Sequence, residues 1–172
     1  MTLFKPMYDR VLQWARHRHA EYYLGAMSFA ESSFFPIPVD VMLAPMVLAD
    51  RSRWIRYAAN ATFFSVLGGL AGYWIGYAVF DAIEPWLRES HYWAAYETSR
   101  DWLEEYGIWV VFVAGFSPIP YKIFTIAAGV ATLSLPAFII GSLIGRAGRF
   151  FLVAGAVRAG GQTLEDLSLI HI

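Results

Sequence analysis

The sequence predicts an all-α integral membrane protein: an inverted repeat of a re-entrant helical hairpin plus a transmembrane helix, with amphipathic helices at the membrane interface. Hydrophobic residues make up 58% of the 172 residues and charged residues only 16%, whereas a soluble domain has about a quarter charged residues. The apolar residues also gather in long stretches, at 22–49, 57–80 and 107–158. Stretches of this length favour a single membrane domain over a large soluble core.

Residues 1–20 place apolar side chains at helical spacing among basic ones, which is typical of a helix lying in the interface. Residues 22–49 form an apolar tract that Pro36 and Pro38 interrupt. Each arm of this tract reaches roughly 16 Å as a helix at 1.5 Å per residue, about half of the hydrocarbon core. The tract is therefore either one kinked spanning helix or a hairpin with the prolines at its tip.

The remaining predicted elements are, in chain order, a transmembrane helix at 58–80, a periplasmic interfacial segment at 81–106, a second re-entrant hairpin at 107–133, a transmembrane helix at 134–158 and a cytoplasmic tail at 159–172. The first helix is uncharged, and the interfacial segment is acidic and rich in Trp and Tyr. The second hairpin has Pro118 and Pro120 at its tip. The abrupt ending LEDLSLIHI indicates a truncated or non-native C-terminus.

Charge favours the hairpin over the kinked helix. The positive-inside rule puts residues 1–20 and the basic segment 50–57 in the cytoplasm, so both ends of the first tract lie on one side. The helix after it then crosses outward, which leaves the acidic segment outside. The second tract therefore enters from the opposite face. A kinked spanning helix remains the alternative, and it would put a charged segment on the less usual side.

A weak internal repeat accompanies this topology. At an offset of 82 residues, the Pro-Ile-Pro of residues 36–38 matches that of residues 118–120, and Gly25 matches Gly107. Asp40 then corresponds to Lys122. Inverted repeats whose broken helices meet near the membrane midplane are typical of secondary transporters.

Five ionisable residues are expected at membrane depth, where each charge costs at least about 2.5 kcal/mol on insertion scales. They are Glu31, Asp40, Lys122, Arg146 and Arg149. We predict that the two carboxylates respond to protons and that the three cations bind an anion, aided by the helix N-termini after each proline pair. Two alternatives stay open: the charges form structural ion pairs, or Asp40 caps its helix.

Other chemistry finds little support in the sequence. There is no cysteine, and the four histidines are scattered, so no metal site and no cofactor are expected. No nucleophile–base pair or nucleic-acid patch is evident, and we predict that the protein is not an enzyme. Gly68, Gly72 and Gly76 repeat every four residues, which favours close helix packing and is compatible with an oligomer.

Three motifs resemble the DedA family of VTT-domain, or SNARE-associated Golgi, proteins. Glu31 with Pro36, Pro38 and Asp40 looks like the family's first-hairpin motif, and the FSPIPYK of residues 116–122 looks like its second. The GRAGRF of residues 145–150 resembles an arginine motif of the YqaA-like branch. Where the wider family often has arginines around the second motif, this chain has Gly115 and Tyr121, which leaves the substrate open.

The resemblance implies a multi-pass protein of the bacterial inner membrane, with a cytoplasmic N-terminus, that moves lipids between leaflets. Its partners would be membrane lipids, among them polyprenyl phosphates such as undecaprenyl phosphate, together with protons. A proton-coupled flippase or scramblase is thus the predicted function. A secondary transporter for a small solute or ion, and a non-transporting assembly or homeostasis protein, remain alternatives.

Overall fold

The computed structural model describes residues 13–33, 37–91, 93–117 and 121–170. Within these ranges the protein is helical and has no β-strand, so the predicted all-α class is confirmed. Its elements are α2 (Ala20–Ser33), α3 (Asp40–Ala49), the 3-10 helix η1 (Arg51–Arg53), α4 (Trp54–Glu89), α5 (Trp93–Phe116), α6 (Tyr121–Val130) and α7 (Leu135–Ile170). Two stretches, Arg51–Glu89 and Leu135–Gly161, are long and apolar enough to cross a membrane.

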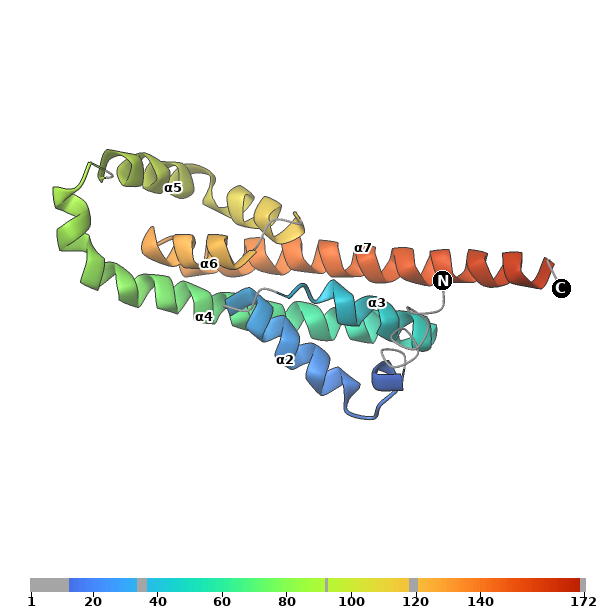
Figure 1. The fold of residues 1–172 in the computed structure, drawn as a ribbon. Coiled ribbons are helices and arrows are strands. Elements are labelled where there is room, and N and C mark those ends of the chain that lie inside the picture. The colour runs from blue at the N-terminus through green and yellow to red at the C-terminus, as the bar shows by residue number, and fades with distance from the viewer. Residues whose placement is uncertain (1–12, 34–36, 92, 118–120, 171–172) are drawn as a thin grey trace.

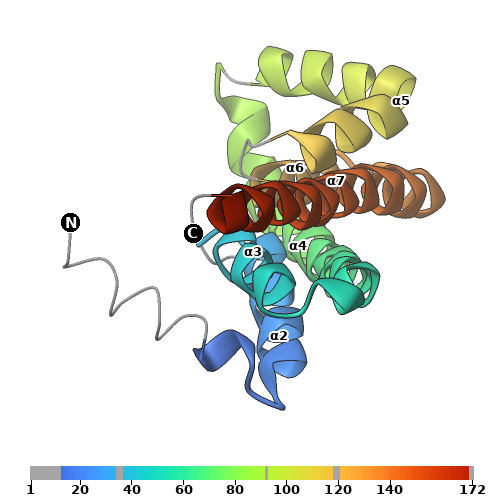
Figure 2. The same cartoon turned by 90° about the vertical axis from the view of Figure 1, so that its right-hand side faces the viewer.

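The long helices α4 and α7 run antiparallel and pack against each other along the centre of the molecule (Figure 1). α2 and α3 extend from one end of this pair to its middle, whereas α5 and α6 extend from the other end (Figure 1). The end-on view places α2 and α5 on opposite sides, with α4 and α7 between them (Figure 2). Each short pair of helices therefore starts and finishes at the same end of the bundle.

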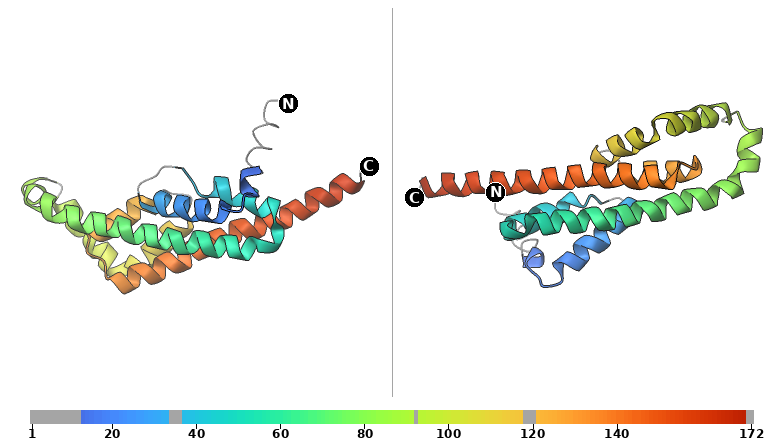
Figure 3. Two further views of the ribbon diagram at one scale, coloured as in Figure 1. Left: turned by 90° about the horizontal axis from the view of Figure 1, so that it is seen from below. Right: turned by 180° about the vertical axis from the view of Figure 1, so that it is seen from behind.

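The packing relates the two halves of the chain. α2 packs on α4 and α5 packs on α7, while the second short helix of each half packs on the long helix of the other half: α3 on α7, and α6 on α4. The view from behind shows α2 on the outer side of α4 and α5 on the outer side of α7 (Figure 3). Exchanging α2, α3 and α4 for α5, α6 and α7 leaves this pattern of contacts unchanged.

Two apolar clusters lie at different levels, and buried polar side chains separate them. One cluster gathers around Leu43 and Phe150, the other around Tyr73 and Phe138. The buried polar residues among those described are Ser28, Ser32, Ser33, Thr62, Ser65, Thr125, Ser142 and Arg146. Because the polar positions of α4 and α7 fall between their apolar ones, the middle of the bundle is polar.

The predicted role of the glycine stripe on α4 is confirmed by the packing. A Cβ added to Gly68 would lie 2.2 Å from the carbonyl oxygen of Phe29 on α2, and one added to Gly76 would lie 2.1 Å from that of Ile126 on α6. No side chain fits at such distances. Glycine therefore lets two short helices, one from each half, approach α4 closely.

Several helices are longer than the predicted segments. α4 continues beyond residue 80 to Glu89 with Pro85 inside it, α5 joins residues 93–106 to the expected first arm of the second hairpin, and α7 continues through most of the expected tail 159–172. Charge made residues 81–106 look interfacial, and residues 159–172 were expected to be a tail, but charge does not stop a helix. Ordinary charged residues are good helix formers.

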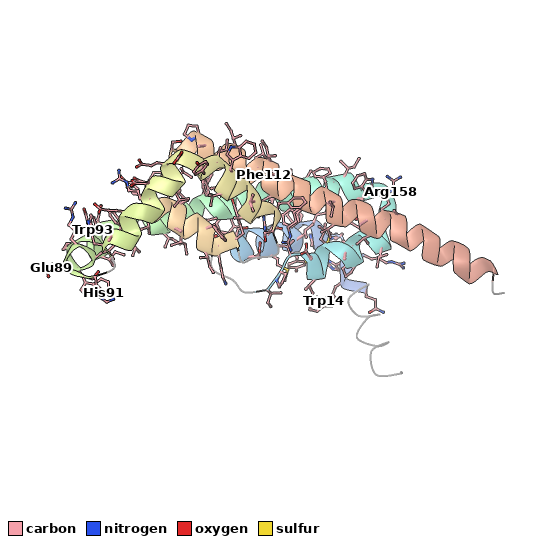
Figure 4. All side chains as sticks on the ribbon, turned by 90° about the horizontal axis from the view of Figure 1, so that it is seen from above. Trp14, Glu89, His91, Trp93, Phe112 and Arg158 are labelled. Carbon is pink, nitrogen blue, oxygen red and sulfur yellow. The ribbon has the colours of Figure 1, made fainter. Side chains whose placement is uncertain are left out.

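The two ends of the bundle differ in charge. Glu89 lies with His91 and Trp93 at one end, far from Trp14 and Arg158 (Figure 4). The end near Trp14 also carries η1 with Arg51 and Arg53. Basic and acidic segments therefore occupy opposite ends of the antiparallel pair α4 and α7.

Candidate functional site

Arg146 of α7 is the centre of the polar middle layer. Its side chain is only 2% exposed, and Nη2 donates to Oε2 of Glu31 on α2 at 2.5 Å. Nε donates to Oγ of Ser65 on α4 at 2.6 Å. The Ser65 hydroxyl lies 2.6 Å from that of Ser32, which neighbours Glu31. One guanidinium thus joins three helices through a connected polar network.

Two aromatic rings complete the surroundings of Arg146. Its guanidinium carbon lies 4.8 Å from the ring centre of Tyr121 on α6 and 4.5 Å from that of Phe150 on α7. Faces of aromatic rings attract cations at these distances. The Tyr121 hydroxyl donates to Ser142, one helical turn before Arg146. The site therefore holds a cation with one carboxylate, two hydroxyls and two rings.

Arg149 makes a second ion pair one turn along α7. Its Nη2 donates to Oδ2 of Asp40 on α3 at 2.5 Å, and its Nη1 donates to the backbone oxygen of Ser117, just after α5, at 2.5 Å. This arginine links the inner ends of both short-helix pairs. Asp40 Oδ1 and Arg149 Nε are buried and have no hydrogen-bond partner among the described residues. One acceptor and one donor thus remain for a further polar group.

The structure brings four of the five predicted site residues into two ion pairs on one face of α7. Lys122, the fifth, stands half-buried in the first turn of α6, next to Tyr121. Its carbonyl oxygen accepts from Thr125 at 2.9 Å. The two carboxylates come from the first half of the chain and the two arginines from the second.

The alternative role of Asp40 as a helix cap is wrong. Val39 occupies the N-cap position of α3 without a capping side chain, and the Asp40 carboxylate turns to Arg149 instead. Pro38 is exposed beside this helix start. The other predicted tip residues, Pro36, Pro118 and Pro120, lie outside the described residues.

Sequence reasoning missed the neutral partners of Arg146. Ser65, Tyr121 and Ser142 bind or position this arginine, yet hydroxyl side chains carry no charge that would mark them in an apolar tract. A usable signal existed for Ser142, because residues four apart share a helix face. For metals, the described residues contain no group of three His, Asp or Glu side chains that could hold an ion.

The fold and the site define a helical protein whose described residues hold two candidate membrane spans, a buried arginine and a half-buried one. Residues 35–159 match the VTT domain. The chain therefore belongs to the VTT domain family, and the predicted resemblance to DedA proteins is confirmed. This membership and the two apolar stretches indicate a membrane protein.

Three relatives extend the comparison. The chain is 42% identical over 162 residues to an uncharacterized protein of Haemophilus influenzae, covering 94% of this chain and 84% of that one. It is 47% identical over 153 residues to an uncharacterized protein of Histophilus somni, covering 89% and 80%. A shorter match of 47 residues, 40% identical, joins 27% of this chain to 23% of undecaprenyl phosphate transporter A of Staphylococcus aureus. No solved structure matches.

Proposed function

We propose that this protein moves lipid phosphates between the leaflets of a bacterial inner membrane, with proton coupling and without a chemical step. The observation that carries the proposal is the Arg146–Arg149 pair, held by carboxylates in the polar middle of the bundle. The name of the Staphylococcus aureus relative supports a polyprenyl phosphate as substrate. Membership of the VTT domain family supports a transport role.

In the proposed orientation, α4 and α7 cross the membrane in opposite directions. The short pairs α2–α3 and α5–α6 enter from opposite faces as re-entrant hairpins, so that their inner ends meet near the midplane. The basic end with η1 faces the cytoplasm, in agreement with the positive-inside rule.

The balance of charge at the site would couple phosphate binding to proton uptake. In the described state two arginines face two carboxylates, and Lys122 lies nearby. A lipid phosphate must compete with Glu31 and Asp40 for the same guanidinium groups, because arginine binds phosphate and carboxylate in the same bidentate way. Protonation of a carboxylate removes the competing charge and frees an arginine. Proton uptake and phosphate binding therefore favour each other.

A second candidate function is structural. Both ion pairs are closed in the described state, and such pairs join α2 and α3 to α7 whether or not anything is transported. In this case the protein is a membrane assembly or homeostasis factor. A third candidate, a transporter for a small anion, rests on the spare donor of Arg149 and would use the same site.

Liposomes that contain the purified protein and a fluorescent polyprenyl phosphate test these functions. We expect lipid translocation that changes between two pH values, and a loss of at least about tenfold in Glu31→Gln and in Arg146→Gln. The matched control is Arg88→Gln, which removes an arginine from an exposed pair with Glu84 at the acidic end of the bundle. It should translocate lipid normally.

The other results separate the alternatives. Normal translocation by both site variants contradicts the proposal. Flux of a small anion without lipid movement supports the third candidate. A lower melting temperature of the site variants, with no translocation by the wild type, supports the structural candidate.

A further inference from the structure

A groove of about 780 Å³ runs between α2 and α4, separate from the arginine site. None of the five predicted site residues lines it. It extends from Arg53 at the end of η1 along α4, past Arg56 and Asn60, to Leu67. At 1.5 Å per residue this distance is roughly 20 Å, enough for a lipid headgroup and the upper part of an acyl chain.

One end of the groove is basic. Arg18, Arg53 and Arg56 line it together with a single carboxylate, that of Glu21. Glu21 accepts from Arg56 at 2.8 Å and lies 3.8 Å from Arg53, which also pairs with Asp50 at 3.2 Å. The side chains of Arg53 and Arg56 are nevertheless 55% and 67% exposed. Three guanidinium groups thus meet one carboxylate in the lining and that of Asp50 beside it, and the remaining positive charge suits a phosphate.

The other end of the groove is apolar and open. Phe29 of α2 and Phe64 and Leu67 of α4 line it. The side chains of Phe29 and Leu67 are 38% and 37% exposed. The groove therefore has a basic end and an apolar end, which match the charged headgroup and the apolar chain of an amphiphile.

Asn60 lies between the two ends. Its Nδ2 donates to the backbone oxygen of Glu21 at 3.3 Å. Its Oδ1 is buried and has no hydrogen-bond partner among the described residues. Asn60 therefore links α2 to α4 in the middle of the groove.

We propose that this groove binds one anionic phospholipid, its phosphate at Arg53 and Arg56 and an acyl chain along Phe64 and Leu67. Charge complementarity selects the ligand, because basic clusters at a membrane surface attract anionic headgroups. The proposal shares the membrane location with the proposed function but does not depend on transport. It adds a lipid site on the outer face of the helix pair α2–α4.

Native mass spectrometry of the full chain in detergent, with phosphatidylglycerol and phosphatidylcholine as probes, tests the site. We expect one phosphatidylglycerol per chain, bound at least about fivefold more tightly than phosphatidylcholine, the factor that one basic residue near a membrane surface is worth. Arg56→Gln should remove this preference. Ala26→Trp, which fills the groove from an exposed position without changing its charge, should weaken both lipids.

Two controls keep the result interpretable. Arg100→Gln removes an arginine from an exposed pair with Glu104 outside the groove and should bind phosphatidylglycerol as the wild type does. Glu31→Gln should also bind it normally even if lipid translocation is lost, so the two proposals can fail separately. Equal binding of both lipids by the wild type overturns the inference, as does unchanged phosphatidylglycerol binding in Ala26→Trp.

Discussion

Arg146 on α7 donates to Glu31 on α2 across 115 residues of sequence, at 2.5 Å and with the arginine almost fully buried. This pair ties the first short helix of one half to the long helix of the other. Arg149 and Asp40 repeat the connection one turn further along α7. The charged residues of the two halves thus neutralise each other only in the assembled bundle.

The energetic role of the Glu31–Arg146 pair can be separated from its proposed transport role. Glu31→Leu leaves a buried guanidinium without its carboxylate, and we expect a loss of about 3–5 kcal/mol in the free energy of unfolding. Glu31→Leu combined with Arg146→Met should recover most of this loss, because apolar residues of similar size often replace a buried ion pair at little cost. Chemical unfolding in detergent measures the free energy of unfolding of the single and the double variants. A loss in the double variant equal to the sum of the two single losses would contradict the pairing.

Gly68 sets the approach of α2 to α4. Since an added Cβ would lie 2.2 Å from the Phe29 carbonyl oxygen, we expect Gly68→Ala to lower the free energy of unfolding by about 1–3 kcal/mol. Gly160→Ala is the matched control, because a Cβ at Gly160 meets nothing within 4 Å. The control should be neutral or slightly stabilising, since alanine favours helix. Equal effects at both positions contradict the packing role.

Thr132 closes α6 in a left-handed conformation, with φ of 54°. The Leu133 amide donates to Ala128 O and the Thr132 amide to Gly129 O, both at 3.0 Å, the hydrogen bonds of a Schellman C-cap. Glycine normally takes this position, because a Cβ there costs about 1–2 kcal/mol. Thr132→Gly should therefore raise the melting temperature, whereas Thr132→Val, which keeps the branched side chain, should not.

Asp50 makes a pH-dependent contribution outside the apolar stretches. Its carboxylate accepts from the Ser52 hydroxyl and amide, and the hydroxyl is the main cause of a pKa below the ordinary value of 3.8. Because folding lowers this pKa, the stabilisation is complete above 3.8 and is lost as the pH falls through the lower folded value.

The measurement is the difference in melting temperature between wild type and Asp50→Ala. We expect a destabilised variant at neutral pH and a difference that shrinks as the pH falls through the lowered folded pKa of Asp50, because the carboxyl is then protonated in both states. Asp50→Asn keeps an uncharged acceptor for Ser52. At neutral pH its melting temperature should lie between those of the wild type and Asp50→Ala. A difference that grows on acidification contradicts this assignment.

The proposed topology puts Ser52 and Ser90 on opposite sides of the membrane. The chain has no cysteine, so Ser52→Cys and Ser90→Cys can each be labelled selectively with an impermeant thiol reagent in intact cells. We expect labelling of the second variant only, and labelling of both after the membrane is opened. Labelling of both residues from the same side would contradict the proposed inverted topology.

Hydrophobicity and charge predicted much of the fold, because long apolar tracts, prolines and the bias of basic residues act locally. They predicted helices in the right order and named both ion-paired arginines with their two carboxylates. They did not predict that α3 would pack on α7 and α6 on α4, since contacts between distant segments leave no local pattern. The hydroxyls around Arg146 were missed for a related reason: serine and threonine bond equally well to their own helix, as Ser28 does with Leu24.

The exchange of short helices between the halves has a consequence for synthesis. α3 is complete at Ala49 and also touches α4, but its main contact surface and the arginine that neutralises Asp40 are made only with α7 after Leu135. α2 can dock on α4 as soon as α4 emerges, because both belong to the first half. α3 and its aspartate therefore complete their contacts only after α7 has been made, and the docking of α7 closes the bundle.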